Sequence, residues 1–230
     1  SGTYTSVTAF ADTSAISSWQ LFGAEGKADG SGISLTGFVS GYNFSSLSYD
    51  NKSFSFTSQD TLNSAIAFNI TGTKMYMAGS ANDRIYQYSL STAYDISTLS
   101  FDNISLAMSP NSTGSQQEIA FKPDGSVMYI SDNSQDSIDI WTVSSGNEYV
   151  IDQYSYNSTK SLSAISAITD LRSVKFKSDG SKFFALDKDT NAVYEFTMST
   201  PWDVANAQHS SSNKYLFLND ITEGSARSMY

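Results

Sequence analysis

The chain has 230 residues, a formal net charge of -10 and no cysteine. The acidic balance argues against nucleic-acid binding, which needs clustered Lys and Arg. The missing cysteines exclude disulfides, thiolate metal sites and cysteine nucleophiles. No apolar run reaches the length of a membrane helix, so no membrane insertion is expected. Because Tyr and Phe number 14 each, we expect a folded chain and not a disordered one.

Taken in chain order, residues 1–40 fit no clear pattern. Lys27-Ala28-Asp29-Gly30-Ser31 looks like a turn, but its flanks are degenerate. From about residue 41 to residue 225 a pattern recurs, and such internal repetition is the strongest architectural signal that a sequence carries.

The repeat begins with a strand, a tight turn and a second strand. Gly72, Gly125 and Gly180 occupy the turns and are separated by 53 and 55 residues. Asp-Gly between two apolar runs is a hairpin signal, because Gly accepts a positive φ without a Cβ clash. We expect three phenylalanines to hold equivalent buried positions before the turns, and three aromatic residues to lie on the paired second strands. These are Phe68, Phe121 and Phe176, with Tyr76, Tyr129 and Phe184.

A second hairpin follows in each repeat. Its strand alternates apolar and polar residues at period two, at 85–88, 138–141 and 193–196. The last part also recurs, since Leu90–Ile96 matches Met198–Val204 and Tyr42–Asn51 matches Tyr94–Asn103. A fourth strand then leads to the next repeat.

Four strands in about 50 residues predict an all-β fold, a β-propeller of four-stranded antiparallel blades. A β-sandwich lacks a sustained period, and a parallel β-helix has shorter rungs. With a repeat of about 53–55 residues, the chain accommodates roughly four blades in a single domain spanning residues 1–230. Residues 1–40 would be a degenerate first blade.

The C-terminus suggests how the array closes. Arg227–Tyr230 aligns with Arg172–Lys175, so the chain ends inside a first strand. We expect Ala226–Tyr230 (residues 226–230) to be a closing strand paired with residues 1–40. Within one chain this gives a small ring, and between chains it gives head-to-tail self-assembly.

The segment Phe121-Lys122-Pro123-Asp124-Gly125-Ser126-Val127-Met128-Tyr129-Ile130 and its counterparts resemble the YVTN, NHL and lactonase-like propeller repeats. The stretch Ser91–Thr98 is similar to repeats of marine phage and bacterial surface proteins. The resemblance covers roughly residues 40–230 and implies architecture more than activity, because this fold hosts unrelated roles. Lactonase-like relatives imply a divalent ion in the central channel, and Ca²⁺ would accept such oxygen ligands.

No catalytic residue emerges from the sequence. His209 is the only histidine and aligns with Phe101 and Tyr156, which indicates an outer-strand packing position. The candidate metal ligands lie at turn positions, where Asp is expected for backbone reasons. They are Asp124, Asp179, Asp132, Asp136, Asp187 and Asp189. We therefore expect neither a metal nor another cofactor, with Ca²⁺ the only weak candidate.

Six Asn-x-Ser/Thr motifs are possible glycosylation sites on a secreted route. They are Asn43, Asn51, Asn69, Asn103, Asn111 and Asn157. Trp141 and Trp202 replace Tyr or Phe of the other repeats, which favours packing between blades over carbohydrate stacking.

Three functions remain open. The first is a non-enzymatic structural or adhesive module of an extracellular, cell-surface or virus-particle assembly, with protein subunits or surface glycans as partners. It is favoured by Ser/Thr richness, by charged residues at only 16% and by the family resemblance. The second is a lactonase-like hydrolase with a channel metal, and the third is a soluble protein-interaction scaffold. Oxygen ligands converging in the channel would favour the second.

Overall fold

The computed structural model describes residues 48–111, 116–163 and 168–209, and the backbone of four short strands outside these ranges. The chain divides into two compact units, Ser1–Asn51 and Lys52–Tyr230. In the first unit, three strands form an antiparallel sheet in the order β1-β2-β3. They are β1 (Trp19–Leu21), β2 (Ala24–Ala28) and β3 (Ile33–Ser34). Strands β2 and β3 flank the predicted turn near residue 30. The assignment of residues 1–40 to a degenerate blade, and of all 230 residues to one domain, stays a prediction.

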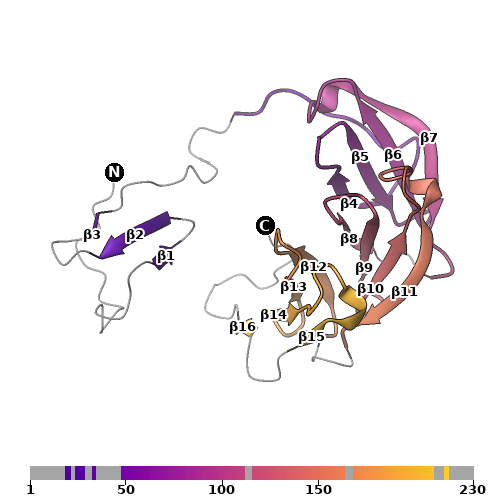
Figure 1. Cartoon of the computed structure of the whole chain (residues 1–230). Helices are drawn as coiled ribbons and strands as arrows, with labels where there is room; N and C mark the ends of the chain where they lie inside the picture. Colours follow the sequence, from indigo (N-terminus) through magenta and orange to yellow (C-terminus); the bar gives the residue numbers. More distant parts are fainter. Residues whose placement is uncertain are drawn as a thin grey trace. The chain divides into compact units, whose positions relative to one another are not determined.

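In the described part of the second unit, the strands form three successive antiparallel sheets, each with its strands in sequence order (Figure 1). The first is built from β4 (Asn63–Phe68), β5 (Lys74–Gly79), β6 (Arg84–Leu90) and β7 (Leu99–Ala107). The second is built from β8 (Gln116–Phe121), β9 (Val127–Asp132), β10 (Ser137–Thr142) and β11 (Ser155–Ser161). The third is built from β12 (Leu171–Phe176), β13 (Lys182–Asp187), β14 (Ala192–Thr197), β15 (Gln208–His209) and β16 (Tyr215–Phe217). Both β15 and β16 pair with β14, so together they occupy the outer position.

Short 3₁₀ turns precede the outer strands at η2 (Ile96–Thr98), η3 (Ile151–Gln153) and η4 (Val204–Asn206). Asp95 and Asp203 accept backbone N–H bonds at the starts of η2 and η4. These Asx caps explain why the Tyr-Asp and Trp-Asp pairs recur in the sequence.

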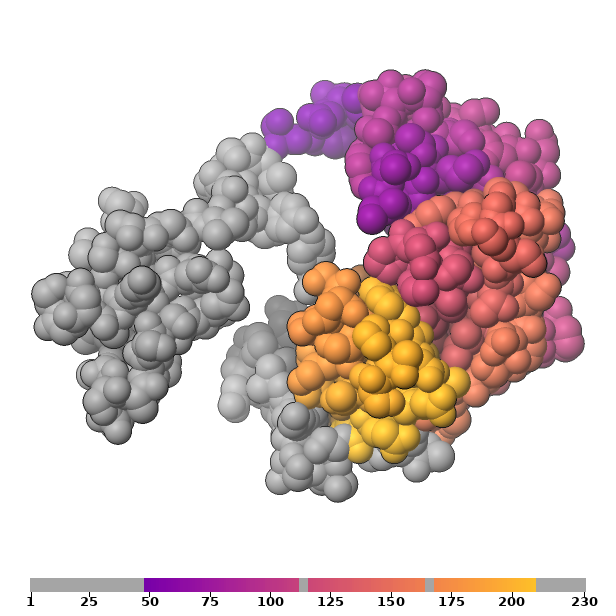
Figure 2. All heavy atoms as spheres, viewed as in Figure 1, coloured from indigo at the N-terminus to yellow at the C-terminus, as the bar shows by residue number. Residues whose placement is uncertain are grey.

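The sheets are consecutive blades because their first strands are neighbours. Strand β8 contacts both β4 and β12, so β4, β8 and β12 are the innermost strands, and Figure 2 shows the blades packed side by side. One apolar core joins the first blade to the second, and it includes Tyr76, Ile85, Met128 and Trp141. Another core joins the second blade to the third. The architecture is that of a β-propeller with four-stranded blades, as the repeat predicted.

The strand register confirms that the three hairpins are equivalent, but the prediction that the three phenylalanines before the turns are buried is wrong. Phe68 pairs with Met75, Phe121 with Met128 and Phe176 with Phe183. The three phenylalanines are half-buried, whereas their partners on the second strands are fully buried. The reason is the position of the first strand, which lies innermost and at the edge of its own sheet, where only the second strand is paired with it.

An aromatic residue covers the hairpin glycine of every blade. Tyr94, Tyr149 and Trp202 all have a positive φ, between 60° and 68°. Their rings lie against Gly72, Gly125 and Gly180, so that a Cβ on any of these glycines would come within 2.5 Å of the ring. Two of these residues also join blades, because the Tyr149 carbonyl accepts the Tyr76 hydroxyl at 2.8 Å and the Trp202 carbonyl accepts the Tyr129 hydroxyl at 2.5 Å.

Candidate binding groove on the inner strands

The innermost strands border a cavity of about 360 Å³. Its lining comes from β4, β8 and β12 and is mostly polar. The lining residues are Ser64, Ala65, Ile66, Gln117, Glu118, Arg172 and Lys175. We call this cavity the inner groove. It is the place where a propeller brings together residues that are far apart in the sequence, and it is the first place to look for chemistry.

Among the described residues that line the groove, Glu118 is the one carboxylate. One of its oxygens accepts the Ser173 hydroxyl at 2.7 Å and the Val174 N–H at 3.0 Å. Its other oxygen pairs with the Lys175 ammonium. All three partners lie on β12, so Glu118 clamps the second blade to the third. The sequence reading missed this residue, because its counterparts in the other blades are Ala65 and Ser173 and no repeat signal marks it.

Arg172 is held in a similar way. Its guanidinium reaches both oxygens of Asp170, at 2.7 and 2.8 Å. Asp170 also receives the Lys188 ammonium at 3.0 Å. Burial opposes ionisation of Asp170, but bonds from these two cations hold the pKa of its carboxyl below the usual value. The groove therefore offers hydrogen-bond donors whose charges are largely balanced.

The turn carboxylates bind backbone, as the sequence predicted. Asp187 accepts the N–H groups of Thr169, Asp170 and Thr190, at 2.6 to 2.8 Å. Asp132 accepts those of Ser134 and Gln135 at 2.8 and 3.2 Å. Each carboxylate fixes its second hairpin turn, and Asp187 also ties that turn to the segment leading into the first strand.

In the first blade, the carboxylate that binds the second hairpin turn comes from a different position in the sequence. Gly79 stands where the other blades have Asp132 and Asp187. The carboxylate of Asp60 fills the space, since a Cβ on Gly79 would lie 2.2 Å from it. Asp60 accepts the N–H groups of Leu62, Ala81 and Asn82 at 2.8 to 3.3 Å. The carboxylate is conserved in space while its position in the sequence changes.

The remaining acidic candidates are also bound. In the first hairpin turns, Asp124 accepts the Ser126 N–H and Asp179 accepts the Ser181 N–H. Each of these carboxylates also forms an ion pair with the lysine two residues earlier. Those lysine bonds lower the pKa of Asp124 to about 2. Asp136 accepts the Leu171 N–H across the blade boundary at 3.0 Å, while burial raises the pKa of its carboxyl. Asp189 is exposed beside Lys188.

Within residues 48–111, 116–163 and 168–209, no three His, Cys, Asp or Glu side chains gather as a metal-binding group. His209 lies on the outer strand β15, against the rings of Tyr194 and Phe196. Trp141 is buried between blades and Trp202 stacks on Phe176. These placements agree with the packing roles expected for them.

In the same part of the chain, no helix is long and apolar enough to cross a bilayer.

The sequon asparagines differ in accessibility. Asn43 lies outside the described residues, and Asn111 is half-buried. Asn51, Asn103 and Asn157 are exposed, so glycosylation at these three stays a prediction. Asn69 is only 8% exposed, and its side chain closes the first hairpin turn through Thr71, Thr73 and the Lys74 N–H. A sugar there would require that turn to open.

The closing strand predicted at residues 226–230 also lies outside the described residues.

No family model and no curated protein matches the sequence. Solved structures do match in part. A protein from Lactobacillus plantarum is 14% identical, with 81% of this chain and 49% of that chain covered and a TM-score of 0.47. The Pseudomonas aeruginosa periplasmic gluconolactonase PpgL is 11% identical over 66% of this chain and 39% of that chain, with a TM-score of 0.46. The Swd1 β-propeller domain of Myceliophteria thermophila is 12% identical over 59% and 39%, with a TM-score of 0.40.

This chain spans between 37% and 49% of the length of such structures. The class of protein, a β-propeller, rests on the strand order and on the contacts between blades. The chain resembles these proteins in architecture, and its own residues must carry any statement about function.

Proposed function

We propose that this protein is a non-enzymatic β-propeller that acts as a structural or adhesive binding module of an extracellular or virus-particle assembly. The observation that carries the proposal is the engagement of Glu118. Its two oxygens are bonded to Ser173, Val174 and Lys175. A carboxylate committed to an ion pair and two hydrogen bonds is poorly placed to accept a substrate proton or to share a cation with others.

What the groove offers instead is suited to binding. Arg172 and Lys175 carry N–H groups in addition to those that bind Asp170 and Glu118, and Ile66 supplies an apolar side chain that is 58% exposed. Donors beside an apolar contact fit a protein segment that carries an acidic side chain next to an apolar one. A protein subunit is therefore the partner that this groove favours. The Ser/Thr-rich composition, in which only 16% of residues are charged, supports an extracellular setting.

Catalysis is tested first. Generic lactones and esters are offered to the purified chain with and without Ca²⁺, and we expect no turnover above background. The Glu118→Gln variant is the matched control. Ca²⁺-dependent hydrolysis that disappears in this variant would overturn the proposal and favour a lactonase-like hydrolase.

Binding is tested by selecting peptides from a displayed library on the immobilised chain. We expect the selected peptides to contain acidic residues and to lose capture on the Ile66→Asp variant. Ile70→Asp is the matched control, because Ile70 is 66% exposed and is not among the residues that line the groove. Equal loss on both variants, or capture that neither variant changes, would show that the inner groove is not the binding surface.

A further inference from the structure

Each blade has two faces with different partners. The side chains of Tyr76 and Ile85 in the first blade, and of Tyr129 and Ile138 in the second, pack against the following blade. We call the face that carries these positions the forward face. The side chains of Trp141 in the second blade and of Phe196 in the third pack against the preceding blade, and we call the face that carries these positions the entry face. In the first blade, the position equivalent to Trp141 and Phe196 is Tyr88.

The entry face of the first blade is covered by the chain itself. Met75, Met77, Tyr86, Tyr88 and Leu90 form a core with Phe54 and Phe56. The rings of Phe54 and Phe56 meet Tyr88 edge-on, at 5.6 and 5.4 Å. The segment 52–60 therefore stands where a preceding blade would pack.

Segment 52–60 is held by side chains and not by strand pairing. None of its residues belongs to a strand. The Tyr88 hydroxyl donates to the Gln59 side chain at 3.3 Å, and the Asn82 amide donates to the Gln59 carbonyl at 2.9 Å. Its two ends are pinned by the Lys52–Asp95 ion pair and by Asp60 in the space beside Gly79.

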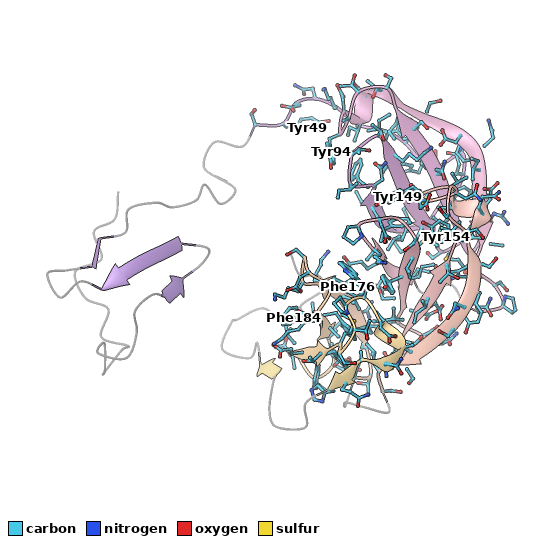
Figure 3. The ribbon with its side chains drawn as sticks, in the orientation of Figure 1. Tyr49, Tyr94, Tyr149, Tyr154, Phe176 and Phe184 are labelled. Carbon is cyan, nitrogen blue, oxygen red and sulfur yellow. The ribbon has the colours of Figure 1, made fainter. Side chains whose placement is uncertain are left out.

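The forward face of the third blade differs from the other two. Ile85 and Ile138 are fully buried, whereas the equivalent Val193 is half-buried. Tyr76 and Tyr129 are buried and donate to carbonyls of the following blade. Their counterpart in the third blade is the half-buried Phe184, labelled in Figure 3. Because phenylalanine has no hydroxyl, this position needs no carbonyl acceptor from a following blade.

We propose that segment 52–60 is an end cap, and that its release lets the entry face of the first blade bind the forward face of the third blade of a second copy. This pairing has a precedent within the molecule. Forward and entry faces already pack together twice, between the first and second blades and between the second and third blades. A head-to-tail contact of this kind gives a closed ring when the rotation between copies adds up to a full turn, and a growing chain of copies when it does not. The inference does not depend on the inner groove.

The test removes the cap's apolar contacts. A Phe54→Ser, Phe56→Ser double variant should shift in light scattering from the mass of one 25.0 kDa chain to multiples of it as concentration rises. The matched control is Ser55→Ala with Thr57→Ala, which changes exposed residues of the same segment and should stay at the wild-type mass. Circular dichroism confirms that each variant is folded. If the double variant does not fold, the single Phe54→Ser variant should show a smaller shift in the same direction.

A third substitution identifies the surface that receives the uncapped blade. Phe184→Glu added to the uncapped variant should restore the mass of one chain, and Phe184→Glu alone should change nothing. A folded, uncapped chain that remains single at all concentrations would overturn the proposal. Assembly that persists with Phe184→Glu would also overturn it, because the exposed aromatic face would then be associating without its proposed partner.

Discussion

Substituting Gly125 by Ala tests the aromatic cover on the hairpin turns. Gly125 has a φ of +72°, where an L-residue costs about 1–2 kcal/mol. A Cβ would also come within 2.5 Å of the Tyr149 ring, so that ring has to leave. Its departure breaks the bond from the Tyr149 hydroxyl to the Pro123 carbonyl, at 2.7 Å, worth about 1 kcal/mol. The contact with the Phe121 ring contributes about 1 kcal/mol more.

The expected loss in the free energy of unfolding is therefore about 3–4 kcal/mol, or a fall in Tm of roughly 10 °C for a chain of this size. Urea denaturation followed by tryptophan fluorescence measures it. The chain supplies its own control, because Gly146 also has a positive φ but has no atom within 4 Å of its would-be Cβ. Gly146→Ala should cost only the backbone strain, about 1–2 kcal/mol. In a Tyr149→Ala background, Gly125→Ala should cost no more than that. Equal losses for Gly125→Ala and Gly146→Ala in the wild-type background would refute the reasoning.

Three further predictions concern the blades. Burial, opposed by a bond from Thr159, raises the pKa of Asp139 from 3.8 to about 6. The folded state then binds the proton more tightly, so stability should fall as pH rises from 4 to 7, and wild type should gain about 1 kcal/mol relative to Asp139→Asn between pH 7.5 and pH 5 in urea titrations. A difference that is flat with pH would contradict this. Asp187→Ala removes an acceptor of three backbone N–H groups and should cost about 3 kcal/mol, whereas Asp189→Ala at an exposed turn should stay within about 0.5 kcal/mol. Similar costs for the two would show that the turn does not depend on the carboxylate. Phe183→Ala, in the core between the second and third blades, should cost about 3–5 kcal/mol. Phe184→Ala should cost clearly less in calorimetry, and a reversed order would mean that the burial assigned to the two faces is wrong.

Much of the blade could be predicted from local signals. Alternating apolar residues define the strands, and Gly72, Gly125 and Gly180 define the hairpins, because both signals act between neighbouring residues. The turn roles of Asp124 and Asp132 were also predictable, since an Asx side chain bonds backbone only a few residues away.

Contacts between blades could not be predicted in this way. Glu118 clamps β12 from more than fifty residues away, and its counterparts in the other repeats are not acidic. Asp60 replaces a missing aspartate at Gly79 from nineteen residues upstream, so an alignment of repeats hides the replacement. Both interactions depend on which segments the fold brings together.

The sequence by itself determined the repeat, the strand order within each blade and the turn chemistry, because these arise from short-range sterics and hydrogen bonds. Only the tertiary structure decided which face of each blade is buried against a neighbour, which residues line the inner groove and what covers the first blade. Those outcomes depend on packing between segments that are distant in the chain. For this reason Phe68, equivalent to Phe121 and Phe176 in sequence, packs against the same core as Phe54 and Phe56, while the other two pack between blades.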